Sequence, residues 1–219
     1  MSAQENAIVR TRIRFTLLAA TLGACAVLSS ETSAYVASGP VWRQPQAAYY
    51  INPANLDLAQ SAVAPAVQAG ADTWALQSHA SFRFSYAGPS TQATTTFDSI
   101  NLVVFRDASN GSAIATTYWW SNSSGIVDAD IVFWDAGFRF FAGATGCTNG
   151  FYIEDIAAHE FGHALGLGHS SSPSATMYPS TSACDARNRT LDSDDISGVE
   201  ALYPPSAAPD PPAGLRFVP

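Results

Sequence analysis

The segment "AAHEFGHALGLGH", residues 157–169, holds three of the four histidines in this chain of 219 residues. His159 and His163 are four positions apart, so on a helix they lie on the same face and present two imidazole nitrogens to one point. Gly166 tolerates the positive φ angle that ends a helix, and the chain can then bring His169 back toward that point. The spacing therefore predicts a helix, a glycine turn and a cluster of three imidazoles.

Three neutral imidazoles leave one position open on a tetrahedral zinc ion, as a catalytic site requires. Glu160 follows the first histidine, where its carboxylate can take a proton from a water that the metal activates. The alternative is a buried helix whose histidines are only hydrogen-bonded, which suits a lone histidine better than this cluster. We therefore expect one catalytic zinc bound by His159, His163 and His169, with Glu160 as the general base.

"HEFGHALGLGH" resembles the extended zinc signature of the metzincin proteases, which also carry a methionine-containing turn beneath the metal. "SATMYP" places Met177 shortly after the third histidine, as such a turn requires. "MYP" and the later "LDSDDISGVEALYP" are similar to the matrixin branch, and the resemblance covers roughly residues 41–204. The resemblance implies a secreted zinc endopeptidase associated with the extracellular matrix. It also implies that Tyr178 and Pro179 line the pocket for the residue after the cut bond.

The resemblance also implies the fold, an α+β domain with a mixed, mostly parallel twisted sheet, an active-site helix and a C-terminal helix. Apolar periodicity agrees with this. It predicts strands within residues 41–52, 81–86, 100–107, 112–120 and 125–135, and helices over 58–79, 151–168 and 192–203, with Asp192 or Ser193 as the last helix's N-cap.

The chain departs from the vertebrate-type pattern upstream of the zinc motif. Those matrixins hold a second, structural zinc with histidines and an aspartate, and here Thr116 and Ile126 stand where two of the histidines would be. The fourth histidine, His79, falls in a predicted helix and is expected at the surface or in a cap. We therefore expect no structural zinc.

Calcium is a second question raised by the resemblance. Asp128 and Asp130 have the oxygen ligands that calcium prefers, but Ile131 stands where the family supplies a glutamate. The sequence favours solvated or hydrogen-bonded carboxylates over a calcium site, without excluding one.

The first 34 residues have the pattern of an export signal. Three arginines precede an apolar run over residues 15–28, and Thr32 and Ala34 are small residues suited to cleavage. That run is too short to span a bilayer comfortably. An alternative interpretation takes "LGAC" as a lipoprotein signal that ends at Cys25. Both interpretations place the mature chain outside the cytoplasm, secreted or periplasmic.

The catalytic domain is expected over residues 35–204, followed by a proline-rich tail over 205–219. No propeptide with a blocking cysteine is expected to fit between Ala34 and Val41. In an oxidising compartment Cys147 and Cys184 are expected to form a disulfide, since both have polar, turn-forming neighbours. Two buried thiols are the alternative.

The composition limits the classes of partner that this chain can bind. The net charge is -8 and there is no lysine, so nucleic acid and anionic membrane surfaces are poor partners. We expect a monomer that binds an extended peptide or protein substrate along the predicted strand "SAIATTYW" by strand addition. Two other functions stay open: a catalytically silent module that binds zinc or peptide, and a metalloenzyme that hydrolyses a non-peptide amide.

Overall fold

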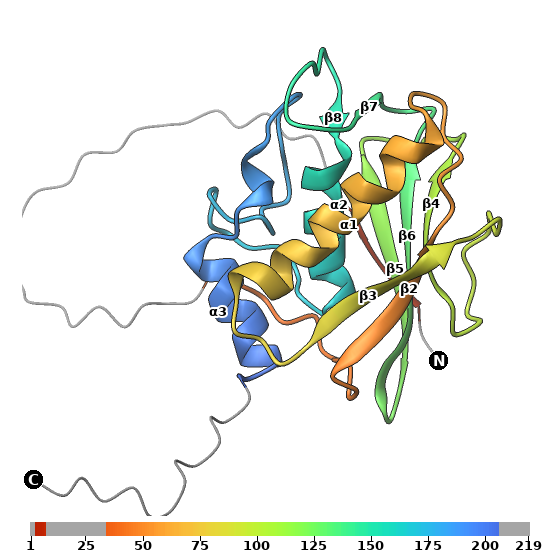
Figure 1. Cartoon of the computed structure of the whole chain (residues 1–219). Helices are drawn as coiled ribbons and strands as arrows, with labels where there is room; N and C mark the ends of the chain where they lie inside the picture. The colour runs from red at the N-terminus through yellow and green to blue at the C-terminus, as the bar shows by residue number, and fades with distance from the viewer. Residues whose placement is uncertain (1–2, 8–33, 206–219) are drawn as a thin grey trace, which may run out of the picture.

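The computed structural model describes residues 3–7 and 34–205 and shows a twisted sheet with two α-helices packed against one face and a third helix beside them (Figure 1). The helices are α1 (Gln60–Gln77), α2 (Ile153–Ala164) and α3 (Ser193–Leu202), with a short 3-10 turn at Arg187–Arg189. The strands are β1 (Ala3–Ala7), β2 (Gln46–Ile51), β3 (Arg83–Pro89), β4 (Asn101–Arg106), β5 (Ala115–Asn122), β6 (Gly125–Trp134), β7 (Phe140–Phe141) and β8 (Phe151–Tyr152).

The main sheet has six strands in the order β1-β5-β6-β4-β2-β3. Strand β2 pairs in parallel with β3 and β4, and β4 pairs in parallel with β6. Strand β5 is antiparallel to β6, and β1 is antiparallel to β5. The predicted α+β class with a mixed, mostly parallel sheet is confirmed. None of the helices in the described residues is long and apolar enough to cross a membrane.

Tertiary pairing moved several predicted boundaries. The predicted helix over residues 151–168 is shorter, because residues 151–152 pair with β7 and the glycine turn ends the helix at Ala164. Strand β1 was not predicted and lies within the proposed export signal. Residues 1–2 and 8–33 of that signal, including Cys25, and residues 206–219 of the tail lie outside the described residues.

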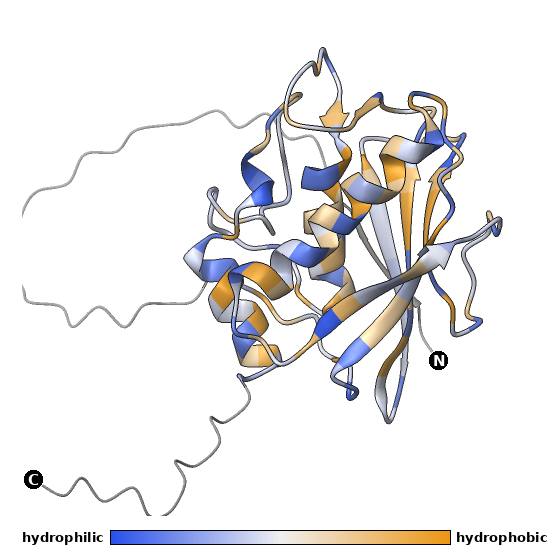
Figure 2. Ribbon diagram, in the orientation of Figure 1, coloured by the Kyte–Doolittle hydropathy of each residue, from blue (hydrophilic) through white to orange (hydrophobic). Residues whose placement is uncertain are grey.

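Helices α1 and α2 cross in close contact, which places α2 against the sheet. A Cβ atom at Gly70 of α1 would lie 2.6 Å from both the Ala157 Cβ and the Glu154 carbonyl oxygen of α2. The Trp74 indole donates a hydrogen bond of 2.8 Å to the carbonyl of Ala158. Figure 2 shows the apolar central strands β4 and β6 behind these helices. Only a residue without a side chain at position 70 lets the helices approach this far.

Two buried aspartates of β6 bind the loop that leads into β4. Both Asp128 and Asp130 are fully buried. One oxygen of Asp128 accepts hydrogen bonds from the backbone N–H groups of Asp98 and Ser99, and its other oxygen has no partner. The two oxygens of Asp130 each accept one backbone N–H, from Thr96 and from Leu102.

These contacts lead to a prediction about pH. Burial, and next the charge of Asp128, raise the pKa of Asp130 to about 8. The folded pKa lies above the unfolded value, so this carboxyl costs stability progressively as pH rises from about 4 to about 8. Asp128→Asn removes the charge next to Asp130. Its side-chain oxygen can still accept the N–H groups of Asp98 and Ser99. The melting temperature of this variant, measured by calorimetry, is expected to exceed that of the wild type by about 2 to 4 °C at pH 8 and by little at pH 5.

Asp130→Asn is the matched control. Each oxygen of Asp130 accepts a backbone N–H, so the substitution places an amide N–H₂ group opposite one of these donors. The lost hydrogen bond lowers the free energy of unfolding by about 1 to 3 kcal/mol. The melting temperature of this variant should fall at pH 5, where the wild-type carboxyl is protonated and costs little. Equal losses for both variants at pH 8 would contradict this assignment of the hydrogen bonds.

Candidate metal centre

Three histidine side chains converge at the C-terminal end of α2. The candidate ligand atoms of His159, His163 and His169 all lie within 4.8 Å of one another. The Nε2 atoms of His163 and His169 are 3.2 Å apart. Both helix histidines are fully buried, and the Nε2 atom of His159 has no hydrogen-bond partner in the described structure. Such a group of buried nitrogens suits a metal ion better than it suits mutual hydrogen bonding.

Backbone carbonyls fix the orientation of the two helix imidazoles. The Nδ1 atom of His159 is 2.6 Å from the Thr176 carbonyl oxygen, and that of His163 is 2.8 Å from the Leu167 carbonyl oxygen. A carbonyl can only accept, so each Nδ1 carries the proton and each Nε2 has its lone pair toward the cluster. Burial, and then the neighbouring His169, lower the pKa of His163 to about 3. The imidazoles are therefore neutral, as metal ligands must be.

Gly166 makes the turn that brings the third histidine back. Its φ angle is +98°, in the left-handed region that favours glycine. The N–H of Gly166 donates to the His163 carbonyl, and the N–H of Leu167 donates to the Gly162 carbonyl. A side chain at position 166 would also come within 2.8 Å of the Pro40 carbonyl oxygen. The predicted turn is present, and the following carbonyl of Leu167 orients the imidazole of His163.

Met177 is buried against α2, the helix that carries His159 and His163. Its sulfur occupies the space that a side chain at Gly162 would need. Asp195 of α3 accepts the backbone N–H groups of Thr176 at 2.7 Å and of Met177 at 3.0 Å. The C-terminal helix therefore holds the methionine turn, and this turn supplies the carbonyl that orients His159. Sequence reasoning did not identify the role of Asp195.

Glu160 is fully buried beside the histidines. Its Oε2 atom is 2.6 Å from the hydroxyl oxygen of Thr117 on β5, while Oε1 has no hydrogen-bond partner in the described structure. Burial raises the pKa of this carboxyl to about 8, and the Thr117 hydrogen bond acts in the opposite direction. A buried carboxyl with one oxygen fixed and one oxygen available is suited to exchanging a proton with water.

The sequence pattern of the matrixin family matches residues 41–204. The chain belongs to the matrixin family. It is 53% identical over 58 residues to human matrix metalloproteinase-20, covering 26% of this chain and 12% of that protein. It is 51% identical over 59 residues to human neutrophil collagenase, covering 27% and 13% respectively. With human matrilysin the identity is 53% over 47 residues, covering 22% and 18%.

The aligned segments thus span less than a fifth of each of these relatives. Family membership rests on the longer match, which includes the helix α2, the methionine turn and α3. Matrixins are zinc enzymes, and the donor set of three neutral imidazoles in this chain fits zinc.

The two positions that are expected to differ from the vertebrate-type pattern make other contacts. The Thr116 hydroxyl accepts a hydrogen bond of 2.9 Å from the Trp134 indole, and Ile126 is buried in the core. The ring of His79 is at the surface, 3.3 Å from a carboxylate oxygen of Glu200. Within residues 3–7 and 34–205, only the three clustered histidines form a group of three or more side chains close enough to share a metal.

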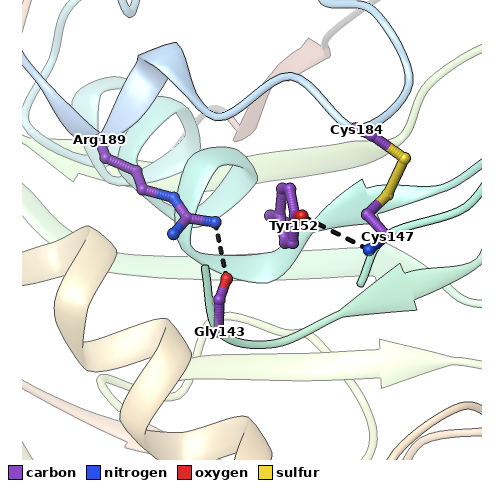
Figure 3. Close-up of a disulfide and its surroundings, with 5 residues drawn as sticks. All are labelled: Gly143, Cys147, Tyr152, Cys184 and Arg189. Atoms are coloured by element: carbon purple, nitrogen blue, oxygen red, sulfur yellow. Dashed lines mark hydrogen bonds between the residues drawn. A yellow bond between two sulfur atoms is a disulfide. The ribbon is translucent and has the colours of Figure 1, made fainter. Parts of the chain in front are cut away.

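A disulfide joins Cys147, before α2, to Cys184, after the methionine turn (Figure 3). The N–H of Cys184 also donates to the Gly150 carbonyl at 2.8 Å. Nearby, Arg189 stacks over the Tyr152 ring at 4.6 Å and donates to the Gly143 carbonyl at 2.9 Å (Figure 3). These contacts tie the loop that follows the methionine turn to the segment leading into α2. Tyr178 and Pro179 are half-buried at the start of that loop, and their role as a pocket wall stays a prediction.

Loss of the disulfide is expected to destabilise this matrixin without altering its chemistry. The bond spans 37 residues, for which loop closure predicts about 3 to 4 kcal/mol of stabilisation. Reduction without a chelator, or the Cys147→Ser/Cys184→Ser pair, should lower the melting temperature and increase self-digestion. Activity at low temperature should be largely retained. A peptide map of exported protein with both thiols free would contradict the assignment.

Proposed function

We propose that this matrixin is a zinc-dependent endopeptidase in which His159, His163 and His169 hold the metal and Glu160 is the general base. The observation that carries the proposal is the convergence of three oriented imidazoles beside a buried carboxyl. One oxygen of that carboxyl lacks a protein partner, as does the Nε2 atom of His159. Two buried polar atoms without partners are costly unless a bound group uses them.

The protein residues have separate tasks in the proposed reaction. When bound, zinc supplies a Lewis acid that polarises the scissile carbonyl and makes a water easier to deprotonate. Glu160 takes the proton from the attacking water through its free Oε1 and then delivers it to the leaving amine. The dry surroundings of the carboxyl raise its pKa, so its ionised form is a stronger base toward the water.

The edge of β5 supports an extended peptide as substrate. In this structure β1 already pairs antiparallel with β5, from Ala3 opposite Trp120 to Ala7 opposite Thr116. The edge therefore has the geometry for strand addition, in which backbone hydrogen bonds hold the substrate. Tyr178 and Pro179, just after Met177, are proposed to line the pocket for the residue after the cut bond.

Two other functions fit less well. A silent zinc- or peptide-binding module would have no use for a fully buried Glu160, which costs stability unless it performs a task. A hydrolase for a small non-peptide amide would not need a strand that pairs with a further extended segment, as β5 pairs with β1. Cleavage of casein or of collagen-derived peptides, measured with and without chelator, separates all three functions.

The remaining proposals concern the cellular setting. We propose export through residues 1–34, with lipid attachment at Cys25 as the alternative, and a monomeric enzyme that cleaves proteins outside the cytoplasm. The disulfide agrees with an oxidising compartment. We also propose that Asp128 and Asp130 need no calcium, since three of their four oxygens bind backbone N–H groups.

Glu160→Ala is expected to keep zinc and to lose nearly all peptidase activity, because the three imidazoles remain while the base is gone. Zinc is measured by mass spectrometry and activity with a fluorogenic peptide. Replacing all three histidines by alanine should abolish zinc binding. Full activity of Glu160→Ala would remove this residue from the mechanism, and stoichiometric zinc in the triple variant would refute the site.

We expect one tightly held zinc per chain, because the Thr116 hydroxyl already accepts a hydrogen bond, the Ile126 side chain has no ligand atom, and the described residues contain one suitable cluster. Native mass spectrometry of protein purified without chelator provides the count. Thr116→Ala should leave that count unchanged. A second zinc that survives dialysis would show that the upstream segment was misaligned with its relatives.

A further inference from the structure

We infer that Thr117 is the positioning residue for Glu160, and this inference rests on the proposed role of Glu160 as base. The Thr117 hydroxyl oxygen lies 2.6 Å from Oε2 of Glu160 and 3.0 Å from its main-chain carbonyl oxygen. Both residues are fully buried. One hydroxyl therefore contacts the carboxyl end and the backbone of the same residue.

These two contacts restrict the glutamate side chain. A free glutamate has three rotatable side-chain bonds, and a carboxyl on such a chain can point in many directions. The hydroxyl holds Oε2 close to the backbone of the same helix turn, which leaves Oε1 as the oxygen without a protein partner. A hydroxyl both donates and accepts, so the contact can persist when the carboxyl gains a proton. Thr117 thus determines which oxygen meets the water.

Thr117 also belongs to the strand at which the peptide is proposed to bind. Its backbone lies opposite Asn6 in the antiparallel pairing of β1 with β5. Its side chain points out of the plane of the sheet, toward α2. The backbone of Thr117 therefore pairs with an added strand, while its side chain contacts the proposed base. This arrangement would keep the base aligned with the bond to be cut.

The adjacent Thr116 provides a matched control. It is equally buried on the same strand, and its hydroxyl is also hydrogen-bonded, but to the Trp134 indole. Alternation along a strand places its side chain on the opposite face of the sheet from Thr117. Thr116→Val and Thr117→Val each remove one buried hydroxyl from β5 and keep a β-branched side chain. A purely structural effect should be similar in both variants.

The experiment compares Thr117→Val, Thr117→Ser and Thr116→Val in the full chain loaded with zinc. Thr117→Val should lower kcat about tenfold to hundredfold, the cost of a misplaced catalytic group. Its KM should change less than about twofold, since ground-state binding is untouched. Thr117→Ser keeps the hydroxyl and should restore most of kcat. All three variants should keep zinc, and a crystal structure of Thr117→Val should show the Glu160 carboxyl displaced.

Several outcomes would overturn the inference. One is a wild-type kcat in Thr117→Val. Another is a decrease in kcat in Thr117→Ser or in Thr116→Val as large as that in Thr117→Val. The last is a loss of zinc that accounts for the decrease in kcat. Glu160→Ala, assayed in parallel, separates this inference from the proposed function. If Glu160→Ala is active, the proposed base is wrong. If Glu160→Ala is inactive and Thr117→Val is fully active, only the role of Thr117 is wrong.

Discussion

The hydrogen bonds from His159 and His163 to backbone carbonyls are the interaction on which the rest of the site depends. A buried imidazole must satisfy its N–H group, and the carbonyls of Thr176 and Leu167 can only accept. This fixes the proton on Nδ1 and turns both Nε2 lone pairs toward one point. Without these two bonds, His159 and His163 would still lie on one face of α2, but nothing would fix the proton of each ring on Nδ1.

Each orienting carbonyl is itself held by a distant part of the chain. Thr176 lies in the methionine turn, which Asp195 of α3 binds through two backbone N–H groups. Leu167 follows the Gly166 turn, and the disulfide closes the segment around both. The C-terminal helix and the bridge therefore affect the metal centre through backbone position, although neither contributes a ligand. A small shift of the turn would rotate an imidazole away from the point that the three histidines share.

The carboxylates and hydroxyls of the sheet show how one residue type serves different purposes. Asp128 and Asp130 use their oxygens to hold a loop by its backbone N–H groups. Thr116 and Thr117 are neighbours, yet one hydroxyl supports an indole in the sheet and the other supports the proposed base. The difference comes from strand alternation, which sends adjacent side chains to opposite faces. Residue type alone does not distinguish these roles.

The sequence by itself determined the features that depend on local spacing. Histidines four apart, a glycine at the helix end and a following histidine define one cluster, because helix geometry converts spacing into direction. The positions of the central strands and helices also followed from local periodicity. Only the tertiary structure decided that Thr117 contacts Glu160 across 43 residues, that Asp195 holds the methionine turn, and that β1 pairs with β5. Those contacts depend on how the sheet, α2 and α3 pack together, and no local pattern encodes that packing.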